Sequence, residues 1–248
     1  MANWLNGKVI DNRRLNDYLT ALIIDVDLGG YEAGQFVRVG LPDGDDEVLA
    51  RPYSLVNTPE ERYLEVYFNI VEEGPLSPRL FALQAGDDIL VSDRPSGFLT
   101  VSEIPAAPHL WMVATGTGIG PFLAILKSEP VWNKFDKVVL CYSVSYQEEL
   151  AYRAMIDDIA RAHPDRFLFV PIVTREPVEG ALGYRVPTVM QDGSLEAFTG
   201  LSISGDNSHV MMCGSSDMIT DVSAALEARG MHKHRRRNPG HFTTEKYH

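Results

Sequence analysis

The sequence predicts a two-domain fold, in which an antiparallel β-barrel over residues 1–101 precedes an α/β domain with a parallel sheet over residues 102–248. Three observations predict it. Short strand-like runs fill the first part of the chain, whereas longer apolar strands alternate with helices in the second. Between them lies SEIPAAPH, residues 102–109, a connection rich in proline and alanine that is typical of a domain boundary.

About six short runs, separated by turn residues, predict the strands of the barrel: KVID, LTALIIDVDL, AGQFVRVGL, RPYSLVN, RYLEVYFNIVEEG and DDILVSD. The fifth run alternates, so that one of its faces carries Leu64, Val66, Phe68 and Ile70. The fourth begins with Arg51 and Pro52, and proline restricts a strand to an edge, a bulge or its first position. One helix interrupts the barrel at LSPRLFALQ, with Ser77 as its N-cap and Pro78 at the first helical position.

The second domain is predicted from apolar runs that alternate with helical segments. The expected strands are HLWMVAT, KVVLCYSVS, FLFVPIVTRE and HVMMCG. The expected helices are PFLAILKS, the long amphipathic QEELAYRAMIDDIARAH, VPTVMQDG and SSDMITDVSAALEARG. Because such strands are apolar throughout, we expect helices on both faces of the sheet.

Composition excludes several classes of function. A net charge of −12 argues against a nucleic-acid surface, and no apolar run approaches the roughly 18 residues of a membrane helix. The beginning of the chain lacks the apolar core of a signal peptide, so we expect a cytoplasmic protein. Two cysteines, Cys141 and Cys213, are too few for a four-cysteine iron–sulfur cluster, and we predict no metal site.

The charge is unevenly distributed. Residues 231–248 carry a net charge of +4 and four of the seven histidines, whereas the remaining 230 residues sum to −16. Such a basic segment is either a solvated terminus or lies beside an anionic ligand or an acidic partner. The final TTEKYH either frays, as termini do, or holds an aromatic ring against a flat ligand.

A glycine-rich turn, ATGTGIGP at residues 114–121, follows the first strand of the second domain. Glycines there let the backbone approach a diphosphate at a helix N-terminus, although a tight turn is the simpler interpretation and Pro121 departs from the usual fingerprint. Arg175 and Arg185 are either surface residues or ligands for a 2′-phosphate. Cys213 and Gly214 end the last clear strand, where open α/β sheets bind ligands, but a cysteine there can also be a buried small apolar residue.

Six motifs follow one another along nearly the whole chain: RPYSLVN, GPLSPRL, ATGTGIGP, VTRE, MMCGSSDM and a terminal E-x-Y. In this order they resemble the bacterial type of ferredoxin (flavodoxin)–NADP⁺ reductase. The resemblance implies a barrel that binds FAD and an α/β domain that binds NADP(H). It also implies hydride transfer between nicotinamide C4 and flavin N5, single-electron transfer to a ferredoxin or flavodoxin that binds transiently, and a monomer.

The resemblance implies the following roles. Arg51 meets the FAD pyrophosphate, Tyr53 packs on the isoalloxazine and Ser54 lies near flavin N5. The FAD phosphates are held by Ser77 and the segment around it, with candidate residues Asn69, Ile70, Val71 and Leu76. NADP(H) is expected to lie along Thr115, Gly116, Thr117 and Gly118. Arg175 and Arg185 are expected to favour NADPH over NADH. Cys213 and Gly214 lie near the nicotinamide, Glu245 near the reacting atoms, Tyr247 over the second flavin face and His248 at the adenine. The implied catalytic residues are Tyr53, Ser54, Cys213, Glu245 and Tyr247.

Two departures from the family pattern bear on these roles. Some relatives carry an arginine after the second strand of the second domain, where this chain has Ser143-Val144-Ser145, and this affects the strength of the NADPH preference. Close relatives often end in tryptophan where this chain has His248, so looser binding of the FAD adenine is expected.

Other functions fit the same scaffold. It also serves NAD(P)H:flavin reductases, the reductase part of oxygenases, and nucleotide-binding redox sensors or electron-transfer subunits. The oxygenase reductases usually carry a cysteine-rich iron–sulfur segment, which this sequence lacks.

Overall fold

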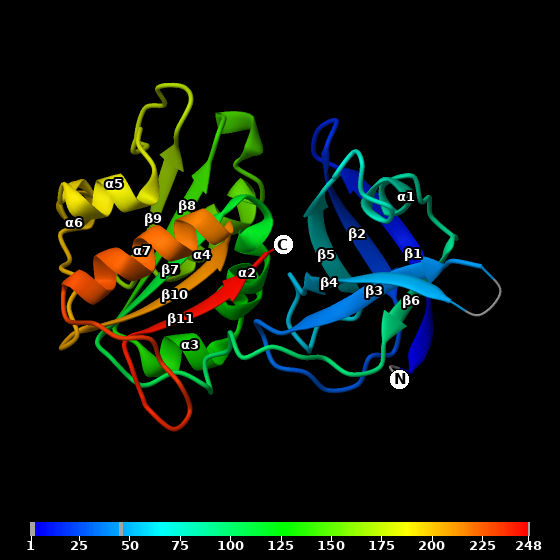
Figure 1. Cartoon of the computed structure of the whole chain (residues 1–248), viewed down its shortest axis with the longest axis horizontal. Coiled ribbons are helices and arrows are strands. Elements are labelled where there is room, and N and C mark those ends of the chain that lie inside the picture. The colour runs from blue at the N-terminus through cyan, green and yellow to red at the C-terminus, as the bar shows by residue number, and fades with distance from the viewer. Residues whose placement is uncertain (1–2, 45–46, 248) are drawn as a thin grey trace.

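The computed structural model describes residues 3–44 and 47–247 and contains two sheets that lie side by side (Figure 1). A six-stranded sheet is formed by the first part of the chain and a five-stranded sheet by the second. The last strand ends in the space between the two domains, next to the barrel (Figure 1). The predicted two-domain fold is therefore confirmed.

The first domain is an antiparallel barrel of six strands. They are β1 (Trp4–Arg14), β2 (Leu19–Asp25), β3 (Phe36–Pro42), β4 (Val48–Ser54), β5 (Leu64–Asn69) and β6 (Asp88–Ser92), in the order β4-β3-β6-β1-β2-β5. An antiparallel bridge between Leu55 and Val66 joins the end of β4 to β5 and closes the barrel. Pro52 lies on β4, which pairs only with β3 in the sheet, so the missing backbone donor falls on an edge strand as expected.

The short helix of the barrel, α1 (Ser77–Phe81), begins one residue earlier than predicted. Ser77 is its first residue and Leu76 its N-cap, so the prediction of Ser77 as the cap was wrong. The reason is that the Ser77 hydroxyl binds the preceding loop instead of capping the helix: the Val71 N–H donates to Ser77 Oγ at 2.9 Å. The Leu76 side chain meanwhile packs in the barrel core.

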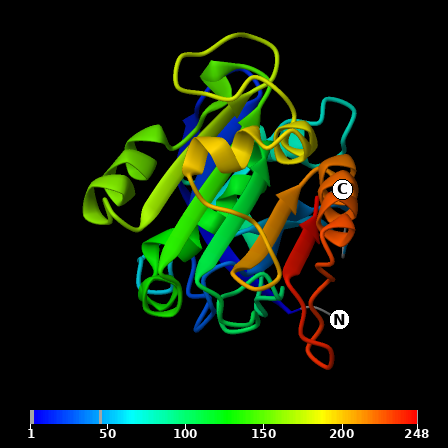
Figure 2. The same ribbon diagram turned by 90° about the vertical axis from the view of Figure 1, so that its left-hand side faces the viewer.

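The second domain contains a parallel sheet of five strands. They are β7 (His109–Thr115), β8 (Lys137–Val144), β9 (Phe167–Val173), β10 (Ser208–Gly214) and β11 (Phe242–Lys246), in the order β11-β10-β7-β8-β9 (Figure 2). The strand β11 was not predicted as such. It pairs in parallel with β10 and aligns Cys213 with Glu245, so residues 242–246 do not fray.

Helices cover both faces of this sheet, because alternate strand residues point to opposite sides. Met112 packs with α2 (Gly120–Lys127), α3 (Glu129–Lys134) and α4 (Arg153–Ala162), on the face that also contacts the barrel. Trp111 packs with α5 (Val186–Gln191), α6 (Ser194–Thr199) and α7 (Ser216–Ala228) on the other face. The sequence did not predict α3 and α6, both of which have only six residues.

The predicted long helix over residues 147–163 is interrupted. A 3₁₀ turn, η2 (Gln147–Glu149), precedes α4, and Tyr152 between them adopts a left-handed conformation with φ of 59°. The Tyr152 hydroxyl donates to Glu65 of the barrel at 2.6 Å, and its ring packs edge-on against Tyr67. The contact between the two domains thus outweighs the helical preference of the segment.

Within residues 3–44 and 47–247, no helix has the length and apolar character needed to cross a membrane. Over the same ranges, no group of three or more histidine, cysteine or acidic residues is placed to bind a metal ion.

The junction of the domains yields a stability prediction at Gly34. Gly34 has a φ of +102°, and a Cβ atom there would lie 2.1 Å from the Leu99 carbonyl oxygen. Gly34→Ala should therefore lower the free energy of unfolding by about 3 kcal/mol, from backbone strain and steric overlap together. Gly86→Ala is the matched control, because Gly86 has a φ of +96° but open space around it. Urea denaturation of both variants measures the difference, and equal losses would contradict the steric contribution.

Candidate functional site between the two domains

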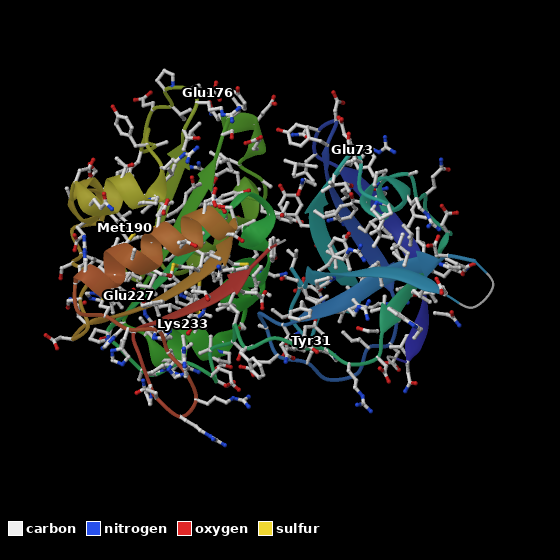
Figure 3. The ribbon with its side chains drawn as sticks, in the orientation of Figure 1. Tyr31, Glu73, Glu176, Met190, Glu227 and Lys233 are labelled. Atoms are coloured by element: carbon white, nitrogen blue, oxygen red, sulfur yellow. The ribbon has the colours of Figure 1, made fainter. Side chains whose placement is uncertain are left out.

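A cavity of about 440 Å³ lies between the barrel and the carboxyl ends of the parallel strands. Open α/β sheets bind their ligands at this edge. The barrel contributes Tyr18, Leu19, Tyr67 and Asn69. Figure 3 shows side chains of the two domains facing each other, with Glu176 at the upper end of one domain and Glu73 at the upper end of the other.

The α/β side of the cavity carries hydroxyl groups and two guanidinium groups. Its polar lining residues are Thr115, Thr117, Ser143, Ser145, Thr174, Arg175, Arg185 and Ser215. Arg175 and Arg185 are exposed, and neither has an ion-pair partner among the described residues. Hydroxyls and unpaired arginines are the donors that phosphate groups require, so this donor set fits a nucleotide with more than one phosphate.

The glycine-rich turn adopts a 3₁₀ turn, η1 (Gly116–Ile119), before α2. A Cβ atom at Gly118 would lie 2.4 Å from the Cys213 carbonyl oxygen, so only glycine lets η1 pack against the end of β10. The Thr115 hydroxyl accepts a hydrogen bond from the Ser215 N–H at 2.9 Å and joins the same two segments. The ends of β7 and β10 are thereby held together as one wall of the cavity.

A second cluster joins the end of β11 to the barrel. The Tyr247 hydroxyl donates to Ser54 Oγ at 2.8 Å, and Ser54 Oγ donates to Glu245 Oε1 at 3.3 Å. The Tyr247 N–H donates to the Gly214 carbonyl at 3.0 Å. Since β10 and β11 align Cys213 with Glu245, four of the five residues predicted as catalytic lie together here.

Burial controls the protonation of this cluster. It raises the pKa of Glu245 to about 7, against the opposing effect of the hydrogen bond from Ser54. Burial and the neighbouring Glu245 raise the pKa of the Cys213 thiol well above its ordinary value, which makes Cys213 a neutral thiol. Burial likewise raises the pKa of Tyr247. The only group of the cluster that titrates near neutral pH is therefore Glu245.

The fifth predicted catalytic residue, Tyr53, is adjacent to this cluster in sequence. Its ring packs edge-on against Phe68 with 5.3 Å between centroids, and burial raises its pKa to about 12. Arg51 is exposed, and within residues 3–44 and 47–247 its side chain donates only to the neighbouring Ala50 carbonyl, at 2.9 Å. Tyr53 directly precedes Ser54 in the chain, and the Tyr247 hydroxyl donates to Ser54 Oγ, while the stacking of the two tyrosines on one flat ligand stays a prediction.

The predicted FAD-phosphate segment is only partly open to a ligand. Asn69 lines the cavity, Val71 is exposed and Ile70 is partly exposed. Leu76 and Ser77 are buried, so their side chains are not open to a ligand. His248 lies outside the described residues.

Sequence reasoning missed several lining residues, among them Tyr18, Tyr67, Glu149, Asp217 and Asp221. The hydroxyl-rich CYSVSYQEE segment did indicate that β8 ends in polar groups. Nothing in the local sequence marks Tyr18, because only the packing of the two domains brings it to the cavity.

The raised pKa of Glu245 predicts a pH-dependent stability. Between the ordinary pKa of 4.5 and the folded value of about 7, the folded protein binds more protons than the unfolded chain. The free energy of unfolding should therefore fall as the pH rises through this window, by about 2 kcal/mol for a partly solvent-screened carboxyl group. Glu245→Gln should remove this slope. Urea denaturation between pH 5 and 8 tests it, and parallel profiles for the two proteins would refute the burial argument.

Comparison with known proteins identifies the family. The family model described as the oxidoreductase NAD-binding domain matches residues 112–224. The chain is 38% identical over 248 residues to the flavodoxin/ferredoxin–NADP reductase of Escherichia coli (strain K12), covering 100% of both chains. It is 31% identical to the ferredoxin–NADP reductase of Pseudomonas aeruginosa, covering 99% of this chain and 98% of that one.

A solved structure agrees with these relatives. The crystal structure of a ferredoxin NADP⁺ reductase from Neisseria gonorrhoeae with bound FAD and NADP superposes with a TM-score of 0.94 at 30% identity, covering 99% of each chain. Two relatives above 30% identity match over the full length, a solved structure at 30% identity shares the fold, and the chain therefore belongs to the flavodoxin/ferredoxin–NADP reductase family.

Proposed function

We propose that this enzyme transfers electrons between NADPH and a ferredoxin or flavodoxin through FAD held between its two domains. The observation that carries the proposal is the cavity at the carboxyl ends of the parallel strands, which hydroxyl and guanidinium groups line. Its lining residue Ser215 follows Gly214, whose carbonyl accepts from Tyr247 of the Ser54–Glu245–Tyr247 cluster. FAD, when bound, supplies the hydride acceptor and passes electrons on one at a time. The protein positions the reacting groups and sets the electrostatic environment around them.

On the α/β side, the donors of the cavity are proposed to hold NADP(H). Thr115, Gly116, Thr117 and Gly118 would face the diphosphate, while Arg175 and Arg185 would bind the 2′-phosphate. Support comes from the exposed, unpaired state of both arginines and from the hydroxyls between them. Cys213, kept as a neutral thiol by burial, and Gly214 would border the nicotinamide.

On the barrel side, Arg51, Tyr53 and Ser54 are proposed to bind FAD, together with the segment of Asn69, Ile70, Val71, Leu76 and Ser77. The Tyr247 ring would cover the opposite flavin face, since its hydroxyl already contacts Ser54. With a pKa of about 7, Glu245 can gain or lose a proton near neutral pH, beside the Ser54 hydroxyl. It would thus provide a proton-exchanging group at the proposed reaction site. His248 is proposed to pack at the FAD adenine.

A basic hairpin formed by residues 232–241 is proposed as the contact for the acidic carrier. Lys233, Arg235, Arg236 and Arg237 are exposed on it, whereas the rest of the chain is strongly acidic. Arg236 pairs with Glu103 and lies over the exposed Phe98 ring, with 4.5 Å to its centroid. We further propose a monomer that binds its carrier transiently in the cytoplasm, where Cys141 and Cys213, both buried and free, stay reduced.

The visible spectrum during anaerobic titration tests the central proposal. Purified protein should be yellow, and NADPH should bleach it at lower concentration than NADH, because only NADPH offers a 2′-phosphate to the arginines. FAD should stay bound through gel filtration. Loss of the flavin as a diffusible product would favour an NAD(P)H:flavin reductase instead.

The end of the chain should regulate access of the nicotinamide. Deleting Tyr247 and His248 should raise the affinity for NADP⁺ about tenfold, because the tyrosine ring no longer occupies the position beside Ser54. The free energy of unfolding should change by less than about 1 kcal/mol, since β11 remains. Absorbance titration of the flavin measures the affinity, and Tyr247→Phe is the control that keeps the ring. Unchanged affinity after the deletion would refute the role of the tail.

Charge reversal on the hairpin tests the docking surface. Arg235→Glu with Arg237→Glu should slow reduction of an acidic ferredoxin by about tenfold at low salt. The difference from the wild type should vanish at high salt, because ions screen these exposed charges. Diaphorase activity with ferricyanide is the control and should not change. Carrier reduction that is insensitive to ionic strength in both proteins would exclude this surface.

A further inference from the structure

One hydrogen bond joins the two domains at the wall of the cavity. The Tyr18 hydroxyl donates to Glu149 Oε1 at 2.5 Å. Tyr18 belongs to the turn between β1 and β2 and is 37% exposed, whereas Glu149 ends η2 after β8. Both residues line the cavity, although they are 131 positions apart in the chain.

Glu149 also closes the loop on which it lies. Its Oε2 atom accepts hydrogen bonds from the N–H groups of Ser145 at 2.7 Å and Tyr146 at 3.1 Å. Its carbonyl oxygen accepts one from the Tyr142 hydroxyl at 3.0 Å. The opposite end of η2 is held by Glu176, which accepts from the Gln147 N–H at 2.6 Å and lies at the upper end of the domain in Figure 3. Loop 145–149 is therefore fixed from both sides.

This loop determines where the phosphate-binding groups lie. The Arg175 N–H donates to the Ser145 carbonyl at 3.0 Å, and the Arg175 guanidinium carbon lies 5.9 Å from the centre of the Tyr146 ring. Ser145 itself lines the cavity. A displacement of Glu149 would therefore move Ser145 and Arg175 together.

The charges around the cavity give a second reason why the position of Glu149 affects the binding of an anionic ligand. Its acidic lining residues are Glu149, Asp217 and Asp221, and its basic ones are Arg175 and Arg185. With three donors on its two carboxylate oxygens, Glu149 is held away from the arginines. If the bond from Tyr18 is lost, Oε1 becomes free to turn into the cavity, where it competes with an anionic ligand for the guanidinium groups.

We propose that the pair of Tyr18 and Glu149 sets the preference of this enzyme for a dinucleotide that carries a 2′-phosphate. The pair acts as a positioning device: a side chain of the barrel fixes the loop that presents Ser145 and Arg175. This inference rests on the proposed NADP(H) site. It adds the pair of Tyr18 and Glu149 to the two arginines that are proposed to bind the 2′-phosphate. It assigns part of the specificity for NADP(H) to the barrel, which is proposed to bind FAD.

Binding of two adenine nucleotides to the flavin-loaded protein tests the pair. We expect Tyr18→Phe to weaken binding of 2′,5′-ADP about fivefold, as expected for the loss of one partly exposed hydrogen bond to a charged group. Binding of 5′-ADP should change less than about twofold, because this nucleotide lacks the 2′-phosphate and so does not make the contact that the pair positions. Isothermal titration calorimetry at fixed ionic strength gives both values. Tyr63→Phe is the control, because Tyr63 lies outside the cavity lining.

Further results bear on the pair. The double variant of Tyr18→Phe with Glu149→Gln should bind 2′,5′-ADP no more weakly than Tyr18→Phe alone, because the two residues act as a unit. In turnover, Tyr18→Phe should raise the KM for NADPH while leaving kcat and the KM for NADH unchanged. Equal weakening of both nucleotides would overturn the inference, since it would show a general structural contact. A wild-type protein that does not favour 2′,5′-ADP over 5′-ADP would instead overturn the proposed NADP(H) site together with it.

Discussion

The parallel pairing of β11 with β10 is the constraint on which the candidate site depends. It aligns Glu245 with Cys213 and places Tyr247 where its hydroxyl reaches Ser54 of the barrel. Without this strand, the end of β10 would lack its neighbouring carboxylate, and the barrel strand β4 would lose its hydrogen bonds to the second domain. An edge strand of five residues therefore connects the two halves of the site.

The apolar contact between the domains supports this arrangement. One buried cluster contains Val56, Tyr67 and Leu99 on the barrel side and residues of α2 and the parallel strands on the other. Polar contacts surround it, such as Lys127 with Glu61 at 2.6 Å and Tyr152 with Glu65 at 2.6 Å. Since a large buried apolar interface resists hinge motion, the cavity keeps its shape and its lining groups keep their spacing.

The sequence predicted the fold well because periodicity and turn residues report local structure. All six barrel strands and four of the five parallel strands follow from their patterns. The misses have physical causes: Tyr152 leaves the helical conformation because its hydroxyl reaches Glu65 of the barrel. Residues 242–246 carry only one buried apolar side chain, so they lack the apolar run that marks the other parallel strands. The cluster at Ser54 and the arginines was predicted from motifs, whereas the roles of Tyr18 and Glu149 depend on contacts between distant segments that no local pattern encodes.

The origin of the clustered residues has a consequence for biosynthesis. Ser54 comes from the first domain, Cys213 from the fourth parallel strand along the chain and Tyr247 from the segment after β11. A ribosome must therefore have released nearly all of the described chain before these groups can meet. The barrel and the first strands of the α/β domain emerge earlier, yet they lack part of the cluster. A nascent or prematurely terminated chain would consequently be without the contact of Tyr247 with Ser54.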